Sequence, residues 1–529
     1  MAAVLRHIYK NVIANWLGLL TSITVGFFLT PFILHRLGDT AFGLWILMGT
    51  LGGYYGLLDL GIRNAVIRYV ARYAASNDEN ELSGVISTSL FTYAGICLVL
   101  LVLTGMTAWK LEWLIHISAE WSHPAKLLLI IFGTGTALGF PLGVFGGVLE
   151  GLQRFTWTNG VQGITALVRA WLVVVTLEKG YGLLTVACIT VALNVLSSAL
   201  YIPLVYHFCP ALEVKWRHAG KGTLRILAVF GLVTFWVGIG ITLRFQVDAV
   251  VIGAFLSVPA ISMFSISSKL VSYASDFVQS MATVFTPMSS HFDAKGDGHQ
   301  LRRILLIGNR YASFVVLPIT LIFVIVGKTI IRVWVGSRYL PTYPVLVILI
   351  LPLTLGLMQA ASTKVLYGMA RHQILARVFV VEGLANLLLS ILLLRWFGII
   401  GVALGTAIPM ACTNVLFLPR HLCGLFGLRL REFLTSAYLY PILLNIPFGV
   451  VLLLADRFIR HKSYITLLIE LTLGVTPYVI GLFIYFEKEK RGERECLASI
   501  DLEGLDLEGT RAPANAPDVR RAVRAAHPF

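Results

Sequence analysis

The sequence predicts an all-α integral membrane protein with about fourteen transmembrane helices, built as two parallel six-helix repeats plus a C-terminal helix pair. Mean hydropathy is +0.81, and 57% of the 529 residues are hydrophobic. Apolar runs long enough for a bilayer, which needs roughly 20 residues, follow one another from Val12 to Phe486. The runs are continuous rather than alternating, which indicates helices and not a β-barrel.

Breaks between the apolar runs define the individual spans. They are predicted at residues 12–34, 40–70, 83–108, 125–149, 159–178, 182–206, 225–247, 259–290, 304–326, 344–368, 374–396, 399–419, 433–455 and 464–486. The second and eighth spans exceed the thickness of a bilayer, so each is expected to tilt or to extend into water.

The distribution of Lys and Arg predicts that both termini are cytoplasmic. With that orientation the cytoplasmic side carries 19 Lys and Arg before the tail, against 12 on the opposite side. The net charge of +15 then reflects short basic loops beside anionic headgroups. Nucleic acid is not an expected partner, because the basic residues are dispersed over many loops.

Two other features predict no chemistry of their own. The six cysteines show no metal-ligand spacing, so we expect small buried thiols and no metal. From Glu487 the chain becomes charged and then rich in Ala, Pro and Arg, which predicts a disordered cytoplasmic tail.

The chain contains an internal repeat. The pattern Leu-x-Gly-x-x-Arg ends the fourth span at Arg154 and the tenth span at Arg371, 217 residues later. Glycine turns precede the sixth and twelfth spans, at Gly180 and Gly398. The predicted units are residues 1–217 and 218–432 (the two repeats), 433–486 (an accessory helix pair) and 487–529 (the tail). Parallel six-span halves are typical of transporters that bind their substrate where the halves meet.

Charged residues within spans are the first candidate site residues, because a charge in hydrocarbon is costly. Lys269 lies near the middle of the eighth span, with Asp276 two turns further along the same face. Lys269 is either a cavity cation for an anionic substrate or the partner of Asp276 in a buried pair, and Asp276 is itself a candidate coupling or gate residue. Arg169, in the fifth span, either faces a cavity or pairs with another helix or snorkels.

The ends of the second and seventh spans supply further candidates. Asp59 and Arg63 are four residues apart and can pair on a helix. Arg63 and Arg68 either capture phosphate at a basic inner mouth or anchor the span at the headgroups. Arg244 and Asp248 close the seventh span, as coupling or gate residues or as simple anchors. Two further carboxylates, Glu150 and Glu382, either carry protons or pair near their own helix ends, Glu150 with Arg154 and Glu382 with Arg377.

No enzyme is predicted. The sequence has no phosphate loop, no His-Glu-x-x-His and no nucleophile elbow. Loops on the outer side, near residues 109–124 and 327–343, are too short for a soluble catalytic domain.

Several loose motifs, in order, resemble those of the polysaccharide (O-antigen, Wzx-type) flippase family of the MATE-like, or MOP, exporter superfamily. They are Phe42-Gly43-Leu44-Trp45, Leu58-Asp59-Leu60-Gly61, Arg68-Tyr69-Val70-Ala71, Gln246-x-Asp248, Pro287-Met288-Ser289, Trp334-Val335-Gly336-x-x-Tyr339 and Gly398-Ile399-Ile400-Gly401. The resemblance covers Asn11 to Phe486.

This resemblance implies a flippase of the bacterial cytoplasmic (inner) membrane that moves undecaprenyl-diphosphate-linked oligosaccharide by alternating access. It also implies a cationic central cavity in which Arg63 and Lys269 hold the diphosphate, with Asp59 and Asp248 as gate or coupling residues. Lys269 departs from the family, which has small or aromatic and polar residues there. Aromatic residues expected to stack on sugars are Trp45, Tyr54, Tyr55 and Trp236.

The resemblance implies no cofactor, and a proton gradient, a sodium gradient or the membrane potential as the energy source. Expected partners are the lipid-linked glycan, membrane lipids and glycan polymerase or assembly proteins. The rival functions are an ion-coupled small-molecule exporter of the same superfamily, a lipid II-type flippase and an integral-membrane enzyme of glycan assembly.

Overall fold

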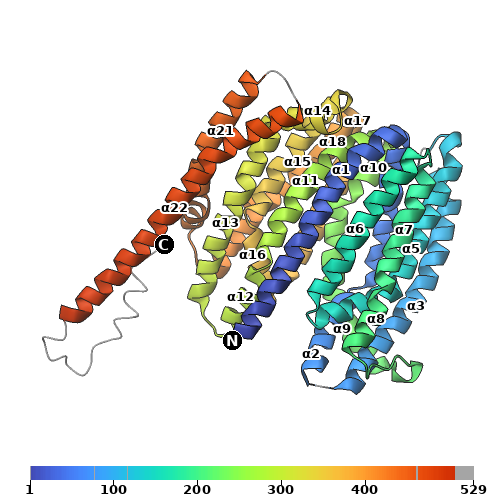
Figure 1. The fold of residues 1–529 in the computed structure, drawn as a ribbon, viewed down its shortest axis with the longest axis horizontal. Coiled ribbons are helices and arrows are strands. Elements are labelled where there is room, and N and C mark those ends of the chain that lie inside the picture. The colour runs from blue at the N-terminus through green and yellow to red at the C-terminus, as the bar shows by residue number, and fades with distance from the viewer. Residues whose placement is uncertain (1, 77, 116, 460–462, 507–529) are drawn as a thin grey trace.

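The computed structural model describes residues 2–506 apart from 77, 116 and 460–462, and these residues form helices and connecting turns without any strand. The helices gather into two lobes and a terminal pair (Figure 1). The first lobe contains α1 (Ala2–Tyr55), η1 (Gly56–Asp59), α2 (Ile62–Ser76), α3 (Glu79–Trp109), α4 (Leu111–Leu114), α5 (Ala119–Gly151), α6 (Phe155–Glu178), α7 (Leu183–Ala199) and α8 (Tyr201–Phe208).

The second lobe and the terminal pair complete the described chain. The second lobe contains η2 (Trp216–His218), α9 (Lys221–Phe245), α10 (Val247–Phe255), α11 (Val258–Ala282), α12 (Phe285–Ala294), α13 (Gly298–Ile325), α14 (Gly327–Trp334), η3 (Ser337–Thr342), α15 (Tyr343–Leu357), α16 (Ala360–Gly368), α17 (Gln373–Phe397), α18 (Ile399–Cys412), η4 (Thr413–Phe417) and α19 (Leu418–Phe426). The terminal pair contains α20 (Leu430–Leu434), η5 (Thr435–Leu439), α21 (Tyr440–Phe458) and α22 (Tyr464–Asp506).

The predicted fold class, an all-helical multi-pass membrane protein, is confirmed. All the predicted spans fall on helices, and 11 described helices are long and apolar enough to cross a membrane, or 12 with the bent pair α9–α10. The count is below the predicted one partly because α1 joins the first two spans across a break at Gly38, where φ is 79°. Polar α11, with seven serines, is not among the 11.

The tail differs from the prediction in its first part. Helix α22 continues through residues 487–506, where disorder was expected from the mixed charges. The rest of the predicted tail, 507–529, lies outside the described residues.

The sequence repeat is matched by a repeated backbone turn. Both Leu-x-Gly-x-x-Arg segments end their helices with a non-glycine residue at positive φ, Gln153 at 57° and Ala370 at 55°. In each, the arginine N–H donates to the leucine carbonyl, at 2.8 Å for Arg154 and 2.9 Å for Arg371. The two glycines let helices approach closely: α5 lies against the carbonyl of Ile67 on α2, and α16 against that of Thr286 on α12.

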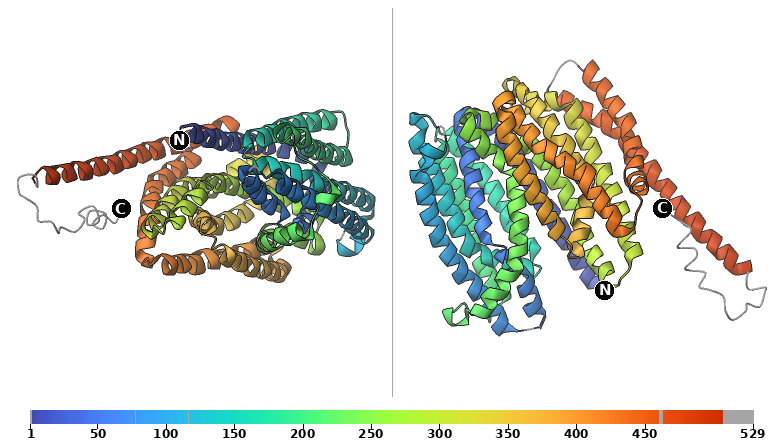
Figure 2. Two further views of the ribbon diagram at one scale, coloured as in Figure 1. Left: turned by 90° about the horizontal axis from the view of Figure 1, so that it is seen from below. Right: turned by 180° about the vertical axis from the view of Figure 1, so that it is seen from behind.

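The two lobes meet at one end of the molecule and diverge towards the other (Figures 1 and 2). The end that carries α10, α14 and η3 is here called the α14 end. The opposite end, which carries α2, α12 and the loop between α8 and α9, is called the α2 end. Helix α1 runs between the lobes and contacts α5 and α6 on one side and α11 on the other.

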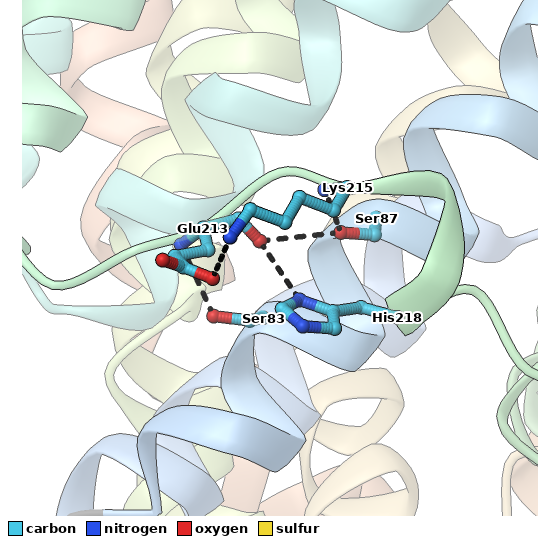
Figure 3. Close-up of polar contacts among 5 residues, drawn as sticks. All are labelled: Ser83, Ser87, Glu213, Lys215 and His218. Carbon is cyan, nitrogen blue, oxygen red and sulfur yellow. Dashed lines mark hydrogen bonds and ion pairs between the residues drawn. The ribbon is translucent and has the colours of Figure 1, made fainter.

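The segment that links the lobes is fastened to the first lobe (Figure 3). Main-chain N–H groups of Glu213 and Lys215 donate to the hydroxyls of Ser83 and Ser87 on α3, at 3.3 and 3.2 Å. Lys215 also donates to the Glu213 carboxylate at 2.5 Å and thereby lowers the pKa of that exposed carboxyl. The predicted boundary between the repeats, 217/218, falls within this segment, in η2.

We expect Gly151→Ala and Gly368→Ala each to destabilise the protein by about 1–3 kcal/mol, because an added Cβ would meet a main-chain carbonyl that cannot move alone. The measurement is the thermal unfolding midpoint of purified protein in detergent. Gly105→Ala on α3 is the matched control, since nothing lies within 4 Å of its added Cβ. Equal midpoints for all three variants would contradict the close packing.

Candidate functional site

A polar cavity of about 480 Å³ lies between the lobes. It is lined by α1, α6, α11 and α16, through Asn15, Trp16, Gly18, Leu19, Ser22, Asn159, Gln162, Asp276, Gln279, Ser280, Thr283, Val284 and Lys364. The lining residues of α1 and α6 lie near the starts of those helices and those of α11 near its end, so the cavity sits towards the α2 end. We call it the central cavity.

A second cavity, of about 350 Å³, extends from the central cavity into the first lobe. The two share Ser22 and Gln162. The other lining residues are Arg63, Gly139, Gly143, Gly146, Thr165, Ala166, Arg169, Asn194, Ser197, Ser198 and Tyr201. We call it the first-lobe pocket.

A third cavity, of about 470 Å³, extends into the second lobe and shares Asp276, Gln279 and Lys364 with the central cavity. We call it the second-lobe cavity. Its walls are more apolar and include Leu349, Leu353, Leu357 and Phe379. The three adjoining cavities therefore cross the interface between the lobes, which is where parallel repeats are expected to hold a substrate.

The structure brings Arg63 and Arg169 together in the first-lobe pocket. Arg63 Nη2 lies 2.6 Å from Glu150 Oε1, so its charge is largely offset by a carboxylate. Arg169 Nη1 donates to Asn194 Oδ1 at 3.3 Å, a neutral partner. The expectation that Glu150 pairs with Arg154 was wrong: Arg154 lies over the ring of Phe208, while Glu150 reaches across to α2.

Two lysines of the second lobe differ in where they lie, because Lys364 lines the cavities and Lys269 is absent from their linings. Lys269 is exposed, its Nζ lies 5.5 Å from the centre of the Tyr273 ring, and its charge interacts with both Asp276 and Arg169. Lys364 lines the central cavity and the second-lobe cavity. The sequence analysis did not select Lys364, although it lies within the predicted span 344–368. The available signal for a cavity position was its place in an interrupted span. The residues that surround it come from helices that are distant in the sequence, so local patterns do not reveal them.

Charges lining the cavities are unevenly offset. Among the described residues, no carboxylate lies within ion-pair distance of Arg169 or Lys364. Arg63 pairs with Glu150, and Lys269 does not line the cavities. The cavity system therefore keeps two cations, one from each lobe, without a carboxylate in contact.

Arg244 and Asp248 belong to a buried polar cluster at the wall of the second-lobe cavity. Arg244 Nε lies 2.7 Å from Glu382 Oε1, and both side chains are almost completely buried. This pair corrects two expectations, because Glu382 does not pair with Arg377 and Arg244 is no surface anchor. A buried pair of this kind costs desolvation, so each partner is needed to keep the other charged.

Asp248 is surrounded by oxygen and amide groups from α17 and α18. Thr406 Oγ1 donates to its two carboxylate oxygens at 3.0 and 3.1 Å, and Asn386 also hydrogen-bonds to it. Ser390 Oγ donates to Asn386 Oδ1 at 2.8 Å. The cluster joins three helices around one buried carboxylate.

Asp59 and Arg68 do not reach the cavities. Asp59 accepts from the Tyr93 hydroxyl and from the main-chain N–H groups of Gly61 and Arg63, so it caps α2. The predicted Asp59–Arg63 side-chain pair does not form, because the helix is interrupted at Leu60 and Gly61, both at positive φ. Arg68 lies 5.9 Å from the centre of the Tyr69 ring.

The expected sugar-stacking aromatics also lie elsewhere. The cavity linings contain none of Trp45, Tyr54, Tyr55 and Trp236. Trp45 packs against Phe132 in the core. The aromatic residue on the central cavity is Trp16, held edge-on by Phe277 of α11.

The α14 end is closed by contacts between the lobes that centre on Asp39 of α1. Its carboxylate lies 2.5 Å from Arg338 Nη2 and accepts from the Tyr339 hydroxyl. Its main-chain carbonyl accepts from Ser262 Oγ at 2.5 Å. Nearby, Trp334 Nε1 donates to the carbonyl of Phe27 at 2.7 Å. We call this set the Asp39 latch.

Known proteins share sequence similarity with this chain. Residues 8–293 match the family model described as "Polysaccharide biosynthesis protein". The uncharacterized membrane protein EpsK of Bacillus subtilis is 22% identical over 437 residues, which is 80% of this chain and 85% of EpsK. A putative O-antigen transporter of Shigella flexneri is 20% identical over 439 residues, covering 79% of this chain and 99% of that protein.

A solved structure shares the fold. The lipid II flippase MurJ, in an inward closed conformation, superposes with a TM-score of 0.69 at 17% identity, covering 91% of this chain and 99% of MurJ. The predicted resemblance to polysaccharide flippases is thereby confirmed at the level of family and fold.

We expect Asp39→Ala to separate the lobes at the α14 end. It leaves Tyr339 and Arg338 without their shared carboxylate, a loss of about 1–3 kcal/mol from the closed state. Spin labels at positions 110 (directly after α3) and 395 (α17) would report the distance between the lobes by double electron–electron resonance.

The expected result is a new, longer distance population in Asp39→Ala. Glu178→Ala is the control, because it removes an exposed carboxylate at the same end outside the latch. An unchanged distance distribution in Asp39→Ala would show that the latch does not hold this end closed.

Proposed function

This chain belongs to the polysaccharide biosynthesis protein family, and from that premise we propose that it is a flippase for undecaprenyl-diphosphate-linked oligosaccharide. One observation supports this above the others. Two adjoining cavities between the repeated lobes carry cations with no carboxylate in contact, Arg169 on the first-lobe pocket and Lys364 on the central cavity. A diphosphate linking a lipid to a sugar carries one negative charge on each phosphate, so the charges match.

Direction follows from the charge distribution and the closed end. We propose that the α2 end faces the cytoplasm of a bacterial cell, with both termini on that side of the inner membrane. The lipid-linked glycan enters the central cavity from there. Closure of the α2 end and release of the Asp39 latch then expose the cavity to the other side, which is alternating access.

The proposed role excludes an enzyme of glycan assembly, since translocation makes and breaks no covalent bond. Its partners are the lipid-linked glycan, the surrounding lipids and the polymerase or assembly proteins that use the translocated unit. An ion-coupled drug exporter on the same fold is the rival function. Cations outnumber carboxylates on the cavity walls, which favours an anionic substrate.

We also propose that the Asp248 cluster couples transport to an ion gradient. A buried carboxylate with hydroxyl and amide oxygens beside it can hold a proton or a sodium ion. The cluster lines the second-lobe cavity, so an ion bound there can respond to movement of α10 against α17 and α18.

The function is tested by transfer of a fluorescent lipid-diphosphate oligosaccharide across reconstituted vesicles. We expect wild-type protein to transfer this lipid. Arg169→Gln or Lys364→Gln should slow transfer about tenfold or more, because each removes one of the two cavity cations that have no carboxylate in contact. Arg68→Gln is the matched control, since Arg68 lies outside the cavities.

Two results would contradict this proposal. Absence of transfer by wild-type protein with several lipid-linked glycans would favour the exporter. Transfer at the wild-type rate by both cavity variants would leave a flippase whose substrate is not held by these cations.

Coupling is tested with Asp248→Asn, which keeps the hydrogen bond from Thr406 and removes the charge. We expect an imposed proton or sodium gradient, applied separately, to accelerate transfer by wild-type protein and to leave the variant unaffected. Asp276→Asn, a cavity carboxylate outside the cluster, is expected to keep its response. A variant Asp248→Asn that still responds to both gradients would place coupling elsewhere.

A further inference from the structure

We propose that the first-lobe pocket binds the sugar residue attached directly to the diphosphate, and that Gly139 and Gly143 set the size of the sugar it accepts. This inference rests on the proposed flippase function. It adds a sugar subsite to a cavity whose cations account only for the diphosphate.

The chemistry of the walls favours a neutral, hydroxyl-rich group. The uncharged polar side chains on the pocket are Ser22, Gln162, Thr165, Asn194, Ser197, Ser198 and Tyr201. Each of these can accept a hydrogen bond, and the hydroxyls and amides can also donate, as sugar hydroxyls do. Ser197 and Ser198 already donate to the Asn194 carbonyl, and Tyr201 donates to that of Thr158. Each hydroxyl oxygen can still accept a hydrogen bond, which a sugar supplies and a lipid chain or an apolar drug does not.

Carboxylates and bulky apolar groups are nearly absent from this lining. Among the described residues on the pocket, no acidic side chain appears, and Ala166 is the only aliphatic residue larger than glycine. The second-lobe cavity also carries uncharged polar side chains, such as Ser268 and Asn414, but mixes them with leucines and phenylalanines. The first-lobe pocket, with its more uniformly polar wall, is therefore the better fit for a sugar.

Two glycines keep the pocket open. A Cβ built on Gly139 or Gly143 of α5 meets no atom within 4 Å, so a side chain there would project into empty space and not into the protein. The volume of about 350 Å³ equals that of roughly a dozen water molecules at about 30 Å³ each. A hexose ring with its hydroxyls fits this space, and a side chain the size of leucine would occupy much of it.

The position of Arg169 connects the two subsites. Arg169 lies on the first-lobe pocket, and its charge reaches Lys269 on the opposite lobe. A diphosphate between Arg169 and the lysines of the second lobe would direct its glycosidic oxygen towards Asn194, which contacts Arg169. The sugar then enters the pocket and the lipid points away from it.

The experiment compares three soluble short-chain ligands of equal charge, citronellyl diphosphate esterified with glucose, with galactose or with methyl. Affinity for purified full-length protein in detergent is measured by thermophoresis. We expect wild-type protein to bind at least one hexosyl ligand about tenfold more tightly than the methyl ligand.

Three variants divide the contributions. Gly143→Leu is expected to abolish the preference for the hexosyl ligand and to leave affinity for the methyl ligand unchanged. Arg169→Gln should weaken both ligands, because it acts on the diphosphate. Gly105→Leu, the matched control on α3, points into open space outside the cavities and should change neither. Unchanged thermal midpoints would show that all variants fold.

The outcomes separate this inference from the function on which it rests. Equal affinity of wild-type protein for methyl and both hexosyl ligands, or a full hexosyl preference in Gly143→Leu, would overturn the sugar subsite while vesicle transfer continues. Failure of wild-type protein to bind any of the ligands and to transfer lipid-linked glycan would overturn the flippase function itself.

Discussion

A charge inside a bilayer must be paired or must face water, and this constraint arranges the polar groups of the protein. Arg244 satisfies it through the buried carboxylate of Glu382, and Arg63 through Glu150. Arg169 and Lys364 have no carboxylate in contact among the described residues, and both lie on the cavities between the lobes. The positive charge of the cavities therefore comes from the cations that have no carboxylate partner.

The cavity between the lobes exists only because the lobes are joined at the α14 end and diverge at the α2 end. Contacts around Asp39 join them at the α14 end, while the linker before α9 is held on the first lobe at the α2 end. Helix α9 packs closely on Leu60 of the first lobe through Gly231 and on α17 of the second lobe through Gly240. Any change in the angle between the lobes must therefore be absorbed along α9 or at its 46° junction with α10.

Local patterns in the sequence were sufficient for the fold but not for the site. Apolar runs determine spans, and Leu-x-Gly-x-x-Arg determines the same turn at Gln153 and Ala370, because both depend on neighbouring residues. Side-chain partners depend on which helices pack together. Glu150 meets Arg63 from 87 residues away, and the break at Leu60 removes the helical spacing on which an Asp59–Arg63 pair depended. The role of Lys364 was missed because its surroundings also depend on which helices pack together.

The division of cations between the lobes bears on how a substrate could drive the cycle. Arg169 belongs to the first lobe and Lys364 to the second, so a diphosphate that binds both would draw the lobes towards each other at the α2 end. A ligand shifts an equilibrium towards the conformation that it binds better. A bridging diphosphate therefore favours closure of the α2 end. Without it, repulsion between Arg169 and Lys269 favours the divergent arrangement of the lobes in Figure 1. Under the proposed function, binding and closure are then one electrostatic event, and the proposed ion coupling would supply the cost of opening the Asp39 latch at the other end.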